Sequence, residues 1–136
     1  MPTSRDRRRG FTLIEIAIAL SLLALLAAVA LPAYRQTALK SRRSEAWSAL
    51  AQLQLQEERW RVLNPQYANA TELGLPASLP SAHYAWSVPV ATAASYTLRA
   101  TAIDTSPQHQ DQQGGDSCRV LEVDQSGQRS PAACWR

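Results

Sequence analysis

The chain has 136 residues, a length that fits one domain of about a hundred residues joined to one further segment. Its formal net charge is +3, but residues 1–10 hold four arginines and one aspartate, so the remaining chain is neutral. A neutral domain lacks the excess of basic side chains typical of nucleic-acid-binding domains, so the composition argues against a nucleic acid as partner.

An apolar segment follows the basic residues. From residue 11 to residue 31 the only charged side chain is Glu15, and a helix of that length spans about 30 Å, enough to cross the hydrocarbon core of a bilayer. A carboxylate in lipid is costly, so Glu15 is a candidate functional residue; the alternative is a signal anchor with a glutamate near the interface by chance. Charge leaves the orientation open, because cations flank both ends: Arg5, Arg7, Arg8 and Arg9 before it, and Arg35, Lys40, Arg42 and Arg43 after it.

The helix is expected to continue beyond Pro32, where the proline predicts a kink and not an end. Residues 33–63 are rich in helix formers. Their apolar residues recur at helical spacing and predict an amphipathic half of the same helix, with Leu39, Ala46, Leu50, Leu53 and Trp60 on one face and Trp47 beside it. Glu57 interrupts that face, and Asn64-Pro65 predicts the end of the helix. A coiled coil is disfavoured, because the pattern is short and has no orderly charge pairs.

The second half of the chain changes to the alternation of β-strands. Residues 64–82 contain Pro65, Gly74, Pro76 and Pro80 and predict a loop, with Tyr67 and Leu73 as anchors. Residues 83–88, 95–103 and 118–123 predict strands, and 128–130 a short fourth one. Loops are expected at 89–94 and 107–115, and a turn at 124–127. The predicted fold class is α+β, with one long helix packed on an antiparallel sheet of three or four strands.

Two stretches near the N-terminus carry a family resemblance. Arg9-Gly10-Phe11-Thr12-Leu13-Ile14-Glu15 resembles the processing site of type IV prepilins, and Leu26-Ala27-Ala28-Val29-Ala30-Leu31-Pro32-Ala33-Tyr34 resembles the run that follows it in that family. The resemblance implies that a prepilin peptidase removes the basic leader 1–10 by cutting between Gly10 and Phe11, and that Phe11 is N-methylated. It also implies that Glu15 pairs with the terminal amine of a neighbouring subunit.

The same resemblance implies a lollipop-like organisation. Residues 11–32 form the transmembrane and polymerisation half of the helix, residues 33–63 its amphipathic half, and residues 64–136 a globular head. In the head, Tyr96-Thr97-Leu98-x-Ala100, the segment from Gly115-Asp116 to Gly127, and Cys134-Trp135 resemble the C-terminal pattern of small type IV pilins, particularly minor pilins.

The two cysteines are Cys118 and Cys134. The family resemblance implies that they form a disulfide that brackets a C-terminal loop, residues 118–134. Both lie in the part expected outside the cytoplasm, where disulfides persist, and closing such a loop is worth about 3 kcal/mol in the chain-entropy model. The alternative is two buried free thiols. The bond is expected to be structural, since there is no C-x-x-C motif.

No catalytic or cofactor site is predicted. The sequence has no G-x-S-x-G motif and no glycine-rich phosphate loop, and neither His83 nor His109 has a partner at metal-ligand spacing. Asp104, Asp111 and Asp116 share one predicted loop and are possible calcium ligands, but their spacing fits no EF-hand and solvated loop acids are commoner. The four tryptophans are expected to serve helix–sheet packing.

The predicted function is that of a non-enzymatic structural subunit, a minor pilin of a type IV pilus. The protein is expected in the inner membrane with its N-terminus cytoplasmic and its head periplasmic, and then in an extracellular fibre serving twitching motility, adhesion or related functions. Its expected partners are the prepilin peptidase, other pilin subunits and the inner-membrane assembly machinery, and no nucleic acid. One alternative is a pseudopilin of a type II secretion system. A DNA-uptake pilin is a third version, disfavoured by the neutral charge of the chain after residue 10. From a different class, the alternative is a signal-anchored periplasmic binding protein or enzyme, which needs a cleft with convergent polar groups.

Overall fold

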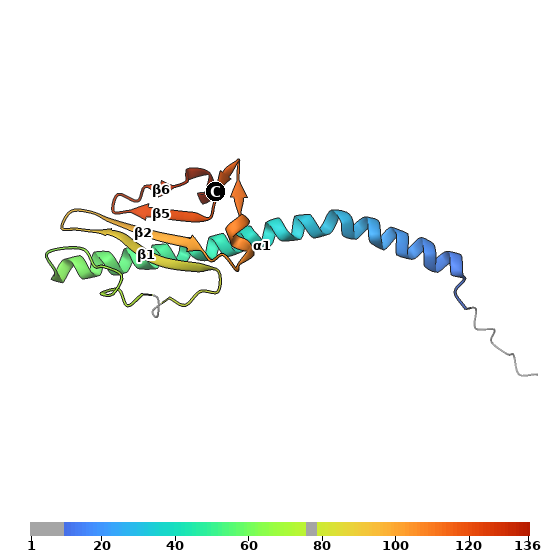
Figure 1. The fold of residues 1–136 in the computed structure, drawn as a ribbon, viewed down its shortest axis with the longest axis horizontal. Coiled ribbons are helices and arrows are strands. Elements are labelled where there is room, and N and C mark those ends of the chain that lie inside the picture. The colour runs from blue at the N-terminus through green and yellow to red at the C-terminus, as the bar shows by residue number, and fades with distance from the viewer. Residues whose placement is uncertain (1–9, 76–78) are drawn as a thin grey trace, which may run out of the picture. The chain divides into compact units, whose positions relative to one another are not determined.

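The computed structural model describes residues 10–75 and 79–136 (Figure 1). The leader predicted at 1–10 therefore lies outside the described residues, apart from Gly10, as does Pro76 of the predicted loop. The chain divides into two compact units, one that ends at Thr37 and one from Ala38 to Arg136, and each is described by itself.

Helix α1 runs from Leu13 to Leu63 and contains Pro32. As expected, the proline does not end the helix; the kink at Pro32 stays a prediction. The apolar part of α1 has a mean hydropathy of 2.6 over an 18-residue window with none of that window buried, so by length and composition it is able to cross a membrane. The large apolar side chains in this part of α1 are therefore exposed and do not pack in the core of the described chain.

The second unit is built on a four-stranded antiparallel sheet in the order β1-β2-β5-β6. Its strands are β1 (Tyr84–Ala91), β2 (Tyr96–Ala102), β5 (Val120–Asp124) and β6 (Arg129–Ser130). In Figure 1 the C-terminal half of α1 lies along β1 and β2. The helix packed on an antiparallel sheet confirms the predicted α+β class.

The core lies between this sheet and one face of α1. Along β2 every second side chain is buried, as the period of a half-buried strand requires: Tyr96, Leu98, Ala100 and Ala102. On α1 the buried positions are three and four residues apart: Arg43, Ala46, Leu50, Leu53 and Glu57. The predicted loop anchors also pack here, with the Tyr67 ring edge-on to Tyr96 at 4.7 Å and Leu73 buried.

Glu57 lies on the apolar face of α1 and interrupts it with a carboxylate, as expected, and its side chain is fully buried. Its Oε2 accepts a hydrogen bond of 2.8 Å from the backbone N–H of Ala68, and this contact holds the loop after α1 against the helix. The carboxylate in the apolar face therefore serves as the buried acceptor for a loop amide.

The first strand is longer than predicted. Residues 89–94 were expected to form a loop, yet β1 continues to Ala91, with its register shifted between Ser87 and Val90. Pro89 lies in this shifted part, and β1 is an edge strand. A proline is tolerated there because an irregular edge position leaves no ladder hydrogen bond for it to donate.

The loop predicted at 107–115 also has regular structure. It contains the 3-10 helix η1 (Pro107–Gln110) and β3 (Gln112–Gln113), which pairs with β4 (Asp116–Ser117) in a small separate hairpin. A second 3-10 helix, η2 (Ala132–Trp135), follows β6. Segments η2, β3 and β4 contact one another and so form one end of the second unit.

Candidate assembly site and candidate binding surface

The first candidate site is the start of α1, where Thr12 and Glu15 form a reciprocal capping box. Glu15 Oε2 accepts hydrogen bonds from the backbone N–H and the hydroxyl of Thr12, both at 2.9 Å. The Thr12 hydroxyl oxygen in turn accepts the backbone N–H of Glu15 at 3.2 Å. This arrangement satisfies amides that the first helical turn leaves without partners. The cap was not among the expectations drawn from the sequence, although its signal, T-x-x-E, is present there.

The capping box leaves part of Glu15 available. The hydrogen bonds given above use Oε2 alone, so Oε1 is open to another donor. All the participating groups belong to Thr12 and Glu15 and so lie after the Gly10–Phe11 bond. The arrangement therefore does not depend on the residues that processing is expected to remove.

The predicted cleavage site is exposed. Phe11 is 84% exposed, and a Cβ atom added to Gly10 would meet no atom within 4 Å. Packing against the residues that the structure describes therefore gives no reason for a glycine at position 10.

The second unit contains a buried polar group that we call the Arg43 cluster: Arg43, Gln108, Asp111, Gln113 and Cys118. Arg43 Nη1 lies 3.2 Å from Asp111 Oδ2, and the two side chains are only 1% and 2% exposed. Nη1 also contacts Cys118 Sγ at 3.0 Å, and Nη2 donates to Gln113 Oε1 at 2.9 Å. A guanidinium with several donors in one plane suits such a multiple contact.

Gln108 completes the cluster. Its Nε2 donates to Asp111 Oδ2 at 2.8 Å and to the backbone carbonyl of Leu39 at 3.1 Å. Burial raises the pKa of the Asp111 carboxyl above its ordinary value, and the neighbouring Arg43 partly offsets that rise. From the sequence, Arg43 was expected only as a charge flanking the apolar segment. Its spacing is the signal that indicates burial, since Arg43 lies three residues before Ala46 on the same helix face.

The three aspartates considered as calcium ligands are not brought together. Asp104 pairs with Arg119 at 2.6 Å, Asp111 is buried against Arg43, and Asp116 lies in the exposed strand β4. Within residues 10–75 and 79–136, no group of three or more acidic, histidine or cysteine side chains is placed to hold a metal ion. Asp104 and Asp111 instead each neutralise an arginine.

The expected disulfide between Cys118 and Cys134 is present. Next to it, Trp135 stacks on Trp47 of α1, with ring centroids 5.9 Å apart and planes inclined by 14°. The guanidinium of Arg129 lies over the Trp135 ring, 5.0 Å from its centroid, and the Trp135 indole N–H donates to the carbonyl of Ser130 at 3.3 Å. We call Arg129, Trp135 and Arg136 the C-terminal surface.

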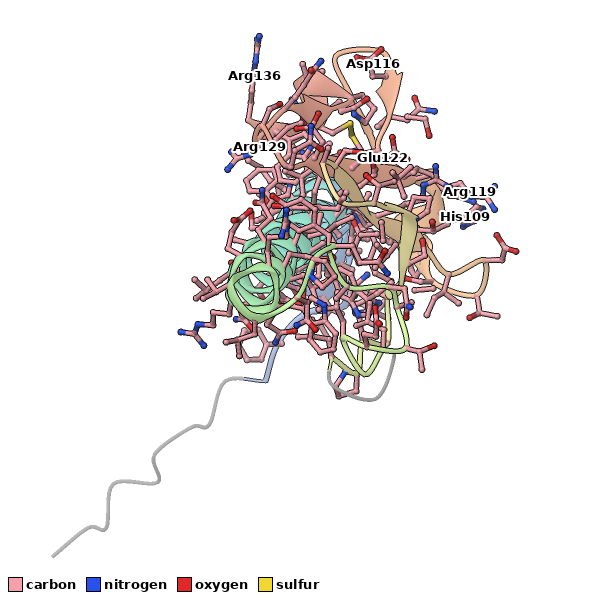
Figure 2. The ribbon with its side chains drawn as sticks, turned by 90° about the vertical axis from the view of Figure 1, so that its left-hand side faces the viewer. His109, Asp116, Arg119, Glu122, Arg129 and Arg136 are labelled. Carbon is pink, nitrogen blue, oxygen red and sulfur yellow. A yellow bond between two sulfur atoms is a disulfide. The ribbon has the colours of Figure 1, made fainter. Side chains whose placement is uncertain are left out.

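The C-terminal surface carries cations that lack an acidic partner. Arg99 and Arg119 form ion pairs of 2.6 Å with Glu122 and Asp104. Arg129 and Arg136 form no ion pair with any residue that the structure describes. Figure 2 shows Arg129 and Arg136 on one side of the second unit and Arg119 and His109 on the opposite side. The C-terminal surface therefore presents two guanidinium groups on one side of the second unit (Figure 2), neither of them in an ion pair among the described residues.

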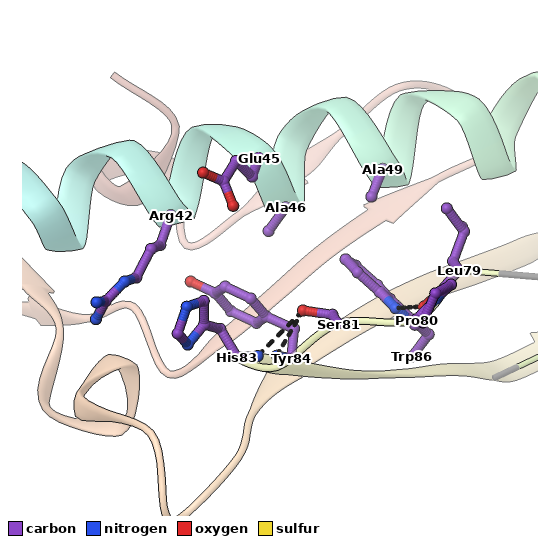
Figure 3. Close-up of a pocket in the computed structure, with 10 residues that line it drawn as sticks. All are labelled: Arg42, Glu45, Ala46, Ala49, Leu79, Pro80, Ser81, His83, Tyr84 and Trp86. Atoms are coloured by element: carbon purple, nitrogen blue, oxygen red, sulfur yellow. Dashed lines mark hydrogen bonds between the residues drawn. The ribbon is translucent and has the colours of Figure 1, made fainter. Parts of the chain in front are cut away.

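A small cavity lies between α1 and the start of β1 (Figure 3). Its volume is about 130 Å³. Charged, polar and apolar residues line it: Arg42, Glu45, Ala46, Ala49, Leu79, Pro80, Ser81, His83, Tyr84 and Trp86. Ser81 Oγ is already used, since it accepts the backbone N–H groups of His83 and Tyr84. Pockets for small-molecule ligands are commonly about 300–1,000 Å³, so this cavity does not favour the alternative of a periplasmic binding protein or enzyme.

A long helix with an apolar N-terminal half and a C-terminal half packed on an antiparallel sheet defines the class of type IV pilins. A solved structure described as the high-resolution structure of a type IV pilin from Shewanella oneidensis is similar to this chain. The TM-score is 0.53 at 25% sequence identity, over 72% of this chain and 98% of that chain. A search of curated proteins found no significant match.

Two family models match the sequence. One, described as the prokaryotic N-terminal methylation motif, covers residues 5–31. The other, described as type IV minor pilin ComP, DNA uptake sequence receptor, covers residues 32–122. The chain belongs to this ComP family of type IV minor pilins, and the expectation of a minor pilin is confirmed. The residues of the C-terminal surface lie beyond the matched range.

Proposed function

We propose that this minor pilin is made as a membrane-bound precursor and is then incorporated into a type IV pilus. A prepilin peptidase cuts between Gly10 and Phe11 and the new terminus of Phe11 is methylated, a step supported by the methylation motif at residues 5–31. Residues 11–32 hold the chain in the inner membrane, with the N-terminus cytoplasmic and the head periplasmic. The inner-membrane machinery then transfers it to the fibre.

In the fibre, Glu15 neutralises the N-terminal amine of a neighbouring subunit. The free Oε1 beside an Oε2 held by Thr12 supports this role. In an apolar fibre interior an unpaired amine costs several kcal/mol, so the pairing selects correctly docked subunits. The exposed apolar side chains of α1 supply the surface that such docking buries.

We further infer that the head binds DNA at the C-terminal surface. The family model that covers residues 32–122 is described as a DNA uptake sequence receptor, and the observation that carries the proposal is the unpaired Arg129 over the indole of Trp135. Phosphate oxygens attract guanidinium groups that form no ion pair, and the cation–π contact with the Trp135 indole holds the Arg129 guanidinium in place.

The proposal reverses the expectation that no nucleic acid is a partner. That expectation rested on a net charge of zero after residue 10, which averages over the whole surface. In the folded head, Arg43, Arg99 and Arg119 are matched by internal carboxylates, so they and their partners cancel. The charges left without an ion pair among the described residues include those of Arg129 and Arg136, which lie on one side of the head (Figure 2) and attract a polyanion there.

Binding of a labelled DNA duplex to the mature full chain in detergent, measured over a range of salt concentrations, tests this proposal. Arg129→Ala is expected to weaken binding and to reduce the slope of log K against log salt by about 0.9, the loss of one phosphate contact. The matched control is Arg119→Ala, which removes an exposed arginine already paired with Asp104. Binding by the wild type without salt dependence, or equal losses in both variants, would refute the proposal.

The other fibre functions, twitching motility and adhesion, are not favoured by any single residue described above. A pseudopilin has the same processing site, so a pilus subunit and a pseudopilin are distinguished by whether the protein is found in surface fibres. Recovery of the chain from sheared surface fibres, identified by mass spectrometry, supports a pilus. If cells with abundant surface fibres keep the chain only in the cell envelope, that result contradicts its incorporation into a pilus.

A further inference from the structure

The C-terminal surface is attached to α1 at two points one helical turn apart. Arg43 reaches the Cys118 end of the disulfide, through the 3.0 Å contact of its Nη1 with Cys118 Sγ. Trp47, four residues further along the helix, stacks on Trp135, which follows Cys134 in the chain. Residues i and i+4 of a helix lie on the same face, so one face of α1 holds both ends of the bonded segment.

Of these two helix residues, Arg43 is buried and Trp47 is half-buried. The terminal nitrogens of Arg43, which is 1% exposed, contact Asp111, Gln113 and Cys118. The indole nitrogen of Trp47 is buried and has no hydrogen-bond partner among the described residues. Their contacts run inward, to the segment that bears Arg129 and Trp135.

The rest of the segment has few attachments of its own. Strand β6 has two residues and pairs only with β5, and η2 is a single 3-10 turn. Such short elements have little intrinsic stability, so the disulfide, the two contacts with α1 and the contacts of η2 with β3 and β4 together determine where the segment lies.

We propose that Arg43 and Trp47 are positioning residues for DNA binding, because they hold the segment 129–135 in the one arrangement that presents Arg129 over Trp135. This inference rests on the proposed binding of DNA at the C-terminal surface. It makes affinity depend on two side chains that do not touch DNA. The Arg43 cluster therefore serves the binding surface as well as the fold.

The test uses the mature full chain in detergent with two variants, Arg43→Lys and Trp47→Leu. Lysine keeps the charge beside Asp111 but lacks the planar set of donors that reaches Gln113 and Cys118 together. Leucine removes the stacking partner and also the unpartnered indole N–H. The matched controls are Arg42→Lys, on the same helix but lining the cavity beside β1, and Trp86→Leu, an indole of β1 outside the stack.

Two measurements are made on each variant: DNA affinity, and the paired circular-dichroism band produced by two stacked indoles. Both test variants are expected to lose the paired band and to bind DNA about five- to a hundredfold more weakly, the loss expected when one arginine contact to the nucleic acid is displaced. Both controls are expected to keep the band and the affinity. If Arg43→Lys fails to fold, Trp47→Leu carries the test.

The outcomes separate this inference from the proposed function. Wild-type protein that binds no DNA refutes the proposed function, and the inference falls with it. Wild-type protein that binds, together with test variants that bind equally well, refutes only the inference, whether or not the paired band is lost.

Discussion

Glu57 and Ala68 are joined by a buried hydrogen bond of 2.8 Å, in which the Glu57 carboxylate accepts the backbone N–H of the loop after α1. Burial raises the pKa of the Glu57 carboxyl above its ordinary value, and the hydrogen bond from Ala68 only partly opposes this. The folded state thus favours the protonated acid more than the unfolded state does.

This relationship predicts how stability depends on pH. Because the folded pKa lies above the unfolded one, the folded state binds more protons between the two values, so the contribution of Glu57 to stability falls as the pH rises through them. Glu57→Gln keeps an acceptor for Ala68 without ionising. Urea unfolding from pH 4 to pH 7 should show that the variant loses less stability on going to neutral pH than the wild type. An identical pH dependence in the two proteins would contradict the prediction.

Replacement of Gly10 should block processing without affecting the fold. A Cβ atom added at Gly10 meets no atom of the described residues within 4 Å, whereas a peptidase pocket beside the scissile bond that accepts glycine has no room for the branched side chain of Gly10→Val. Uncleaved precursor should accumulate in the membrane, as measured by the mass of the N-terminal peptide. Mature protein of normal size from Gly10→Val would rule this out.

Replacement of Glu15 should prevent assembly and leave the head intact. Glu15→Ala removes both the capping box and the carboxylate, so Thr12→Ala is the matched control: it removes the cap and keeps the carboxylate. Loss of the cap alone costs about 1 kcal/mol. We expect cleaved Glu15→Ala protein in the membrane but none in sheared fibres, and Thr12→Ala protein in both. Equal incorporation of Glu15→Ala and wild type would reduce Glu15 to a helix cap.

The segment before Pro32 should stay largely helical in the fibre. Type IV pilins usually have glycine at the position of Ala24, and in assembled fibres the stretch from that glycine to the proline tends to lose helicity. Alanine favours helix over glycine by about 1 kcal/mol, and α1 is helical through this stretch. A fibre reconstruction is expected to show melting only near Pro32. Fully extended residues 24–31 would count against the prediction.

Removal of the disulfide should destabilise the head. The bond joins residues 16 positions apart, and closing a loop of that length is worth about 3 kcal/mol in the chain-entropy model. The paired replacement Cys118→Ser with Cys134→Ser should lower the free energy of unfolding by about that amount or more, since both positions are fully buried. The reduced wild-type protein is the control. A change below about 1 kcal/mol would show that the loop is already ordered in the unfolded chain.

The amino-acid sequence by itself determined the features of this protein that depend on neighbouring residues. The processing motif around Gly10 and Phe11 is contiguous, and the apolar run after Glu15 is defined by length and composition. Helix α1 and the strands follow from apolar residues that recur with periods of 3.6 and 2, and such periods are visible within a short stretch of sequence. Even the cap formed by Thr12 and Glu15 has a local signal, two residues only three positions apart.

The tertiary structure decided what depends on residues far apart in the chain. Arg43 and Asp111 are separated by 68 positions, and their charges alone do not indicate that one pairs with the other inside the protein. Pro89 was expected to end a strand, yet the edge of the sheet tolerates it. Net charge is a property of composition, whereas a basic surface depends on which arginines the fold pairs with carboxylates. Arg129 stays unpaired over Trp135 because folding, through the disulfide and the stack on Trp47, brings the C-terminal segment onto α1.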